Sequence, residues 1–114
     1  MLTLANLKKI VALNGGATLT HKGEIAALDH GYMVSLSGCE YVTTLDALDE
    51  RTYKAYCRMA RKKKAYFGLW LDGDALYLDM SIRVGDKIAA RKIGKKNDQI
   101  AIFDLSKKES IYLN

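Results

Sequence analysis

One short stretch of the chain concentrates its positive charge. The window from Arg51 to Lys64 holds seven Lys and Arg side chains and no carboxylate. Its first four cations are three or four residues apart, and residues at these spacings share one face of a helix. Such a stripe can contact successive phosphates, which gives salt-sensitive binding of nucleic acid without base specificity. The candidate contact residues are Arg51, Lys54, Arg58, Arg61, Lys62, Lys63 and Lys64.

A solvated helix face is the alternative explanation of this window. The acids Asp46, Asp49 and Glu50 precede the bases, an order that the helix dipole favours. A merely solvated face usually mixes charge signs, however, and this one does not. Both explanations stay open at this level. If this face binds nucleic acid whose strands are opened, the tyrosines at positions 53, 56 and 66 could stack on the bases.

A second basic group follows in the C-terminal half. Lys87, Arg91 and Lys95 are four residues apart and share one side of a short predicted helix, with Lys92 and Lys96 beside them. We expect these cations to extend the binding surface if the two helices pack on the same side of a sheet. Ordinary solvated surface is the alternative explanation.

An aromatic pair forms a third candidate site. The segment Tyr66–Met80 alternates apolar and other residues on both sides of an Asp72-Gly73 turn, the pattern of a β-hairpin. A loop at Asp72-Gly73 makes Leu69 face Leu76, and places Trp70 diagonal to Tyr77 on the other face. Trp70 and Tyr77 are therefore candidate anchors for a protein partner. A helix covering this face would instead make them core residues.

No catalytic, metal-binding or cofactor-binding motif is evident. Cys39 and Cys57 lack the paired spacing of metal ligands, and no local pattern ties either thiol to His21 or His30. A metal-dependent nuclease using Asp72, Asp74 and Asp79 is the enzymatic alternative. A tight turn explains the first two of these residues equally well. We predict a non-enzymatic protein without a cofactor.

The elements that position these residues predict an α+β fold. An N-terminal helix capped by Thr3 and closed by Gly15-Gly16 precedes short strands. A central helix then begins at Thr44 or Asp46, and a third runs from Asp86 to near Gly94. Because the strands cluster in antiparallel pairs, we expect an antiparallel sheet of short strands and hairpins with two main helices and one short helix.

Length and composition limit the class of protein. A chain of 114 residues suits a single domain over positions 1–114. No apolar run approaches the ~20 residues that span a bilayer, so we expect no membrane association. Two cysteines without a pairing pattern are typical of a reducing cytoplasm.

The C-terminal half resembles small accessory proteins of phages and mobile elements. The resemblance covers GLWLDGDALYLDMSIRVGDKIAARKIGKKNDQIAIFDL and is carried by Gly68, Trp70, Asp72, Tyr77, Asp79, Ser81, Asp86, Ala90, Gly94, Gln99, Ala101, Ile102 and Asp104. It implies an inhibitor of host defence of the anti-CRISPR or anti-restriction type, which acts by binding a host nuclease or nucleoprotein complex in the bacterial cytoplasm. A stand-alone DNA- or RNA-binding or regulatory protein is the alternative.

Overall fold

Each of the three helices begins at a side chain that caps it. The computed structural model describes residues 1–113 and contains α1 (Leu4–Asn14), α2 (Glu50–Lys63) and α3 (Lys87–Lys96). The side chains of Thr3, Asp49 and Asp86 accept the backbone N–H three residues ahead, at 3.2, 2.8 and 2.8 Å. Each bond satisfies one of the donors that a helix start leaves without a partner.

Two of the predicted helix boundaries are wrong. The central helix is capped by Asp49 and starts at Glu50, because Thr44 instead closes a separate turn: its Oγ1 accepts the N–H of Ala47 at 3.1 Å, and its carbonyl accepts that of Leu48. The third helix continues past Gly94 to Lys96. Gly94 therefore lies inside the helix. Because glycine has no Cβ, the side chains of Leu113 and Ile102 can approach the helix closely at this position.

Seven strands complete the α+β fold that the sequence predicts, and their registers are antiparallel. They are β1 (Gly16–Leu19), β2 (Tyr32–Ser35), β3 (Tyr41–Thr43), β4 (Tyr66–Asp72), β5 (Ala75–Val84), β6 (Ala101–Asp104) and β7 (Glu109–Tyr112). The strand order is β1-β4-β5-β2-β6-β7, and β3 also pairs with β5. Between β1 and β2, Ile25 forms an isolated bridge to Leu19.

The chain divides into two units, and β5 contributes to both. The first unit comprises Met1–Ala26 and Cys39–Met80, and the second comprises Ala27–Gly38 and the residues from Ser81 onward. Among residues 1–113, no helix is long and apolar enough to cross a membrane. Whether positions 1–114 fold as a single domain stays a prediction.

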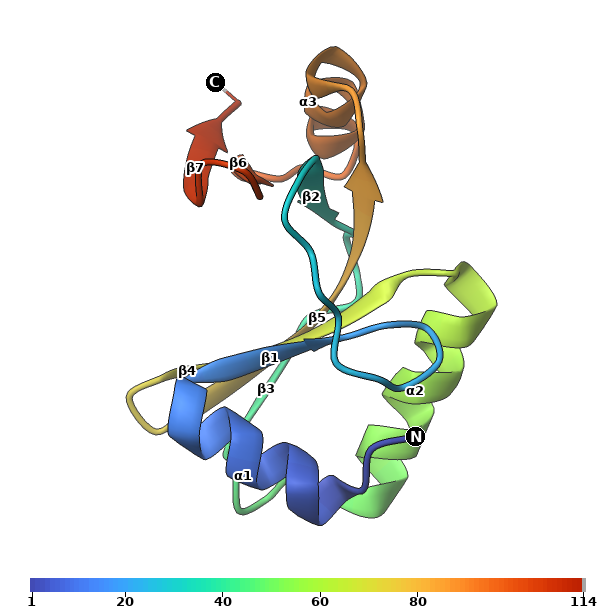
Figure 1. Ribbon diagram of the computed structural model, residues 1–114, viewed down its shortest axis with the longest axis vertical. Helices are drawn as coiled ribbons and strands as arrows, with labels where there is room; N and C mark the ends of the chain where they lie inside the picture. Colours follow the sequence, from blue (N-terminus) through green and yellow to red (C-terminus); the bar gives the residue numbers. More distant parts are fainter. Residues whose placement is uncertain (114) are drawn as a thin grey trace. The chain divides into compact units, whose positions relative to one another are not determined.

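In the first unit, α1 and α2 lie on the same side of the strands (Figure 1). Leu19 on β1 pairs with Phe67 on β4, and both side chains are fully buried on this side. Leu7 and Val11 of α1 and Tyr53 of α2 are buried as well. Burial of a Leu- or Phe-sized side chain contributes about 1.5–3 kcal/mol, so these residues dominate the stability of the unit.

The β4–β5 loop is Gly73-Asp74, so the predicted Asp72-Gly73 loop is wrong by one position. Gly73 has a φ of +60° whereas Asp74 has a negative one, and glycine at the first loop position is typical of a type II′ turn. The shift changes the facing pairs, because Leu69 now lies opposite Leu78 and not Leu76. Both strands nevertheless keep the same inward faces, since the pairing moves by two residues.

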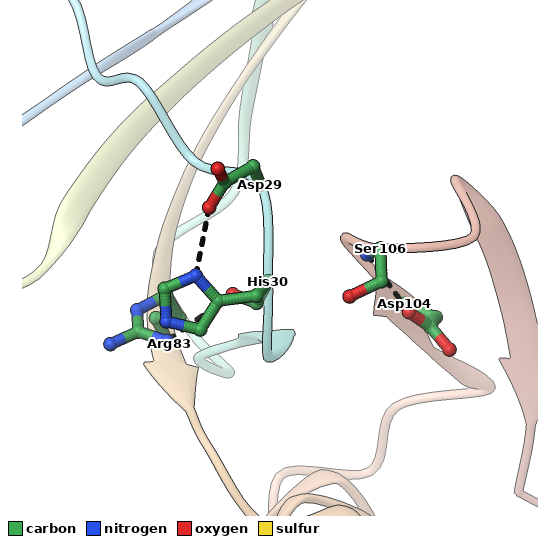
Figure 2. A network of polar contacts seen from close by, with 5 residues as sticks. All are labelled: Asp29, His30, Arg83, Asp104 and Ser106. Atoms are coloured by element: carbon green, nitrogen blue, oxygen red, sulfur yellow. Dashed lines mark hydrogen bonds and ion pairs between the residues drawn. The ribbon is translucent and has the colours of Figure 1, made fainter.

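In the second unit, α3 packs on β2 and β6 around a small apolar core. Val34, Ala90, Ile102 and Leu113 are its buried residues. Polar contacts order the loops (Figure 2). The carboxylate of Asp104 accepts the backbone N–H groups of Ser106 and Lys107 at 3.0 and 3.1 Å, which shapes the β6–β7 loop.

A close approach of two strands makes Gly16 sensitive to substitution. A Cβ at this position would lie 2.7 Å from the carbonyl oxygen of Leu69, which belongs to the backbone and has little room to move. We expect Gly16→Ala to lower the free energy of unfolding by about 1–3 kcal/mol, the usual cost of overpacking. A Cβ at Gly85 meets nothing within 4 Å, so Gly85→Ala is the matched control. Chemical denaturation followed by circular dichroism tests this, and equal midpoints for the two variants would contradict it.

Candidate nucleic-acid interface

The local sequence determines where α2 begins and ends. Asp49 caps its start, and the first turn carries Glu50 while the last turn carries Arg61, Lys62 and Lys63, an order that the helix dipole favours. The helix closes at Lys64, which adopts the left-handed conformation with a φ of 53°. The backbone N–H of Ala65 then donates to the Ala60 carbonyl at 2.9 Å and turns the chain toward β4.

The inner face of α2 consists of Tyr53, Tyr56, Cys57 and Ala60, all buried. Both tyrosine rings contact Phe67, that of Tyr56 in a stacked arrangement with centroids 4.9 Å apart. Their hydroxyl groups donate to main-chain carbonyls, Tyr56 to Cys39 at 2.8 Å and Tyr53 to Leu2. The expectation that these two tyrosines stack on bases is therefore wrong, because the core already uses both rings. Tyr66 on β4 is half-buried.

Burial keeps the inner face uncharged. It raises the pKa of the Tyr53 hydroxyl to about 12 and also raises the pKa of Tyr56. Burial likewise raises the pKa of the Cys57 thiol, which holds it in the unreactive protonated form. Cys39 is also buried, and neither cysteine forms a disulfide. These thiols are therefore poorly suited to act as nucleophiles.

Six of the seven predicted cations lie on α2 and the seventh, Lys64, is its C-cap, and every one of them is exposed. The set, called the α2 basic face below, comprises Arg51, Lys54, Arg58, Arg61, Lys62, Lys63 and Lys64. Lys54 lies 3.9 Å from Glu50, an exposed pair one helical turn apart that contributes little energy. Among residues 1–113, no other Lys or Arg forms an ion pair with a carboxylate within 4.0 Å. Most of the charge on this face is thus left for solvent or a partner.

The second basic group lies on α3. Lys87 and Lys95 are exposed, and Arg91 between them is half-buried. Because α3 belongs to the second unit and α2 to the first, one continuous patch formed by both helices stays a prediction.

The aromatic pair forms a direct contact. The rings of Trp70 and Tyr77 are stacked, with centroids 5.5 Å apart and planes within 7° of parallel. The two residues face each other across the hairpin and are not diagonal neighbours as predicted, because the loop lies one position later. Neither α1 nor α2 covers them, since both helices pack on the opposite side of these strands. Trp70 keeps 42% of its surface exposed.

The carboxylates proposed for a nuclease have different environments. Asp72 and Asp74 are exposed beside the β4–β5 turn, whereas Asp79 is 6% exposed, with its carboxyl group lying over Gly68. Within the described part of the chain, no three His, Cys, Asp or Glu residues gather as metal ligands would.

A further polar contact, between His30 and Asp29, could not be anticipated from the sequence. The His30 ring lies 2.8 Å from the Asp29 carboxylate, and its hydrogen bond lowers the pKa of that group. Nη1 of Arg83 donates to the His30 carbonyl at 3.2 Å (Figure 2). The exposed His30–Asp29 pair and Arg83 order the loop before β2.

Comparison of the chain with protein-family models, with curated proteins and with solved structures gave no match. The resemblance to phage accessory proteins therefore stays a prediction.

The buried Tyr53 predicts a specific loss of stability at high pH. Its hydroxyl loses a proton near 10.0 when unfolded but near 12 when folded. The contribution of the neutral Tyr53 hydroxyl to the free energy of unfolding is therefore complete below pH 10 and is lost as the pH rises toward 12. Tyr53→Phe removes the hydrogen bond to Leu2, so we expect it to lower stability at pH 7 by about 1 kcal/mol.

Denaturation of both proteins between pH 8 and 12 provides the measurement. The wild type should lose stability faster than Tyr53→Phe above pH 10, so the difference between them narrows. A constant difference over the whole range would show that the phenol does not titrate in this way.

Proposed function

We propose that this chain is a non-enzymatic binding protein whose α2 basic face holds an anionic polymer, with the backbone of DNA or RNA as the first candidate. The observation that carries the proposal is the accumulation of seven exposed cations on α2 and its C-cap, where the only ion pair within 4.0 Å, among the described residues, joins Lys54 to Glu50. The buried thiols, with Cys57 held protonated, argue against catalysis by a thiol nucleophile.

The dimensions of the helix suit this partner. Arg51 and Arg61 are ten residues apart, which corresponds to about 15 Å along a helix axis. Phosphates of one DNA strand follow at about 3.4 Å along the duplex axis, so the face spans several of them. The tyrosines of α2 are buried, so its outer face offers no aromatic ring on which a base could stack. The binding that we propose is directed at the phosphate backbone.

The biological role that we propose is inhibition of a host defence nuclease or nucleoprotein complex. The support is the resemblance of residues 68–105 to phage and mobile-element accessory proteins, together with a basic face that suits the nucleic acid of such a complex or an acidic surface on the nuclease. The second candidate is a stand-alone DNA- or RNA-binding or regulatory protein, which the same face favours if it binds nucleic acid unaided.

Charge reversal on the α2 basic face tests the binding mode. We expect the wild type to bind single- and double-stranded oligonucleotides with affinity that falls with salt. If four cations each neutralise a phosphate of the duplex, a plot of log K against the logarithm of the salt concentration has a slope of about −4. Replacing Arg58, Arg61 and Lys62 by Glu should abolish binding. Because three acids near a helix C-terminus also weaken the helix, the same positions changed to Gln provide a second variant.

The matched control changes Lys9, Lys22 and Lys107 to Glu, three exposed residues outside α2. It has the same net charge as the first variant and should keep most of the affinity. Fluorescence anisotropy measures binding, and circular dichroism confirms that each variant is folded. If the control and the α2 variants lose the same affinity for oligonucleotides, net charge alone explains the loss. That result would contradict the α2 basic face as the binding site.

Co-expression tests the biological role. The wild type, produced in cells carrying one of several CRISPR or restriction systems, should restore phage growth against at least one system, and the Arg58/Arg61/Lys62 variants should not. Binding of oligonucleotides without protection against any system would favour the stand-alone role. Protection that persists in the α2 variants would mean that another surface carries the inhibition.

A further inference from the structure

The first unit has a second face, on the side of the sheet opposite α1 and α2. Phe67, Leu69, Leu76 and Leu78 point toward the helices and are buried. The alternate residues of the same strands, Gly68, Trp70 and Asp72 on β4 and Tyr77 and Asp79 on β5, therefore point to the other side. We call this the Trp70 face. At its centre, the stacked Trp70 and Tyr77 rings form a rigid aromatic block.

The residue that pairs with Trp70 on β1 has no side chain. Trp70 pairs with Gly16 on β1, which has no side chain, while Tyr77 pairs with Val42 on β3. Tyr77 therefore covers one side of the indole, and no β1 side chain opposite covers the other. Its 42% exposure agrees with an accessible ring surface. Such a site accepts a flat group that stacks on the indole.

The charge of the Trp70 face determines which flat group it suits. Residues 65–82 contain three Asp and no Lys or Arg, and the adjacent strands β1 and β3 carry no charged residue. Asp72 is exposed, two residues from Trp70 on the same side of β4, whereas Asp79, two residues from Tyr77 on β5, is buried. A carboxylate beside an aromatic face favours a cation and repels phosphate.

We propose that the Trp70 face binds an arginine-bearing segment of a partner protein. The planar guanidinium stacks on the indole above Gly16 and donates hydrogen bonds to the Asp72 carboxylate. Arginine suits the site better than lysine because its planar fork can stack and donate together. The proposal does not rest on nucleic-acid binding, since α2 packs on the other side of the strands.

The single tryptophan of the chain makes a direct test available, because its fluorescence reports on the proposed site. The probe is a capped Gly-Arg-Gly-Arg-Gly peptide, and the matched peptide carries neutral citrulline in place of arginine. We expect a saturable change of emission with the arginine peptide only. A response to both peptides, or to neither at millimolar concentration, would overturn the proposal.

Two single substitutions locate the contact. Asp72→Asn should raise the Kd by about two- to fivefold, the effect of one exposed charge pair. Asp74→Asn removes the same charge from the loop and should leave the Kd unchanged. Equal effects of the two would overturn the assignment of Asp72, and so would the absence of any effect.

Dilution of the protein without peptide tests whether a second copy of the chain occupies the Trp70 face. Because α2 itself carries arginines, a second copy of the chain could occupy the Trp70 face. The proposal predicts an emission spectrum that is independent of protein concentration without peptide. A concentration-dependent spectrum, accompanied by dimers in sedimentation velocity, would mean that the chain binds itself. This result would overturn the proposal that a separate partner protein binds the Trp70 face.

Discussion

The packing of Tyr53 and Tyr56 on Phe67 is the contact on which the first unit depends. The two rings bury the inner side of α2, and their hydroxyl groups tie the helix to the main chain at Leu2 and Cys39, far apart in the sequence. Each buried hydroxyl has a partner, so the contact avoids the penalty of an unsatisfied polar group. Because this contact determines the rotation of α2, the residues between the buried positions must face solvent. The α2 basic face is therefore a direct consequence of the aromatic core.

The same contact places the basic residues of α2 on one side of the strands, opposite the side to which Trp70 and Asp72 point. The helices occupy one side of β4, whereas Trp70 points to the other side, and the segment 65–82 of β4 and β5 contains three Asp and no Lys or Arg. Of the Lys and Arg side chains in residues 1–113, only Lys54 forms an ion pair with a carboxylate, that of Glu50, so the opposite charges hardly neutralise one another within the chain. A protein with one basic and one acidic, aromatic face suits a target that presents both phosphates and arginines. A nucleoprotein complex has both, which joins the two proposals physically.

Local chemistry made much of this fold predictable. Thr3 and Asp86 cap helices as their residue types indicate, and alternation in β4 and β5 identified the inward faces correctly. The errors arose where neighbouring residues offer equivalent local solutions, since Thr44 and Asp49 are both good caps, and Asp72-Gly73 and Gly73-Asp74 both form turns. Long-range pairing decides such cases. It also places Gly16 beside Trp70, and no local signal in the sequence indicates that contact. The burial of Tyr53 and Tyr56 likewise depends on Phe67 and not on the helix pattern alone.

The observed start of α2 also clarifies why its charge distribution points to function. Acids at the start and bases at the end are what the dipole favours, so Glu50 and the bases from Arg61 to Lys63 need no explanation beyond helix stability. Arg51 is different, because a helix that begins at Glu50 places it in the first turn. A cation there opposes the dipole, at a cost of about 0.3–1 kcal/mol. Lys54 and Arg58, in the middle turns, gain little from the dipole. The helix dipole therefore does not account for the N-terminal half of the α2 basic face, whereas the polyanion that we propose as its partner would account for it.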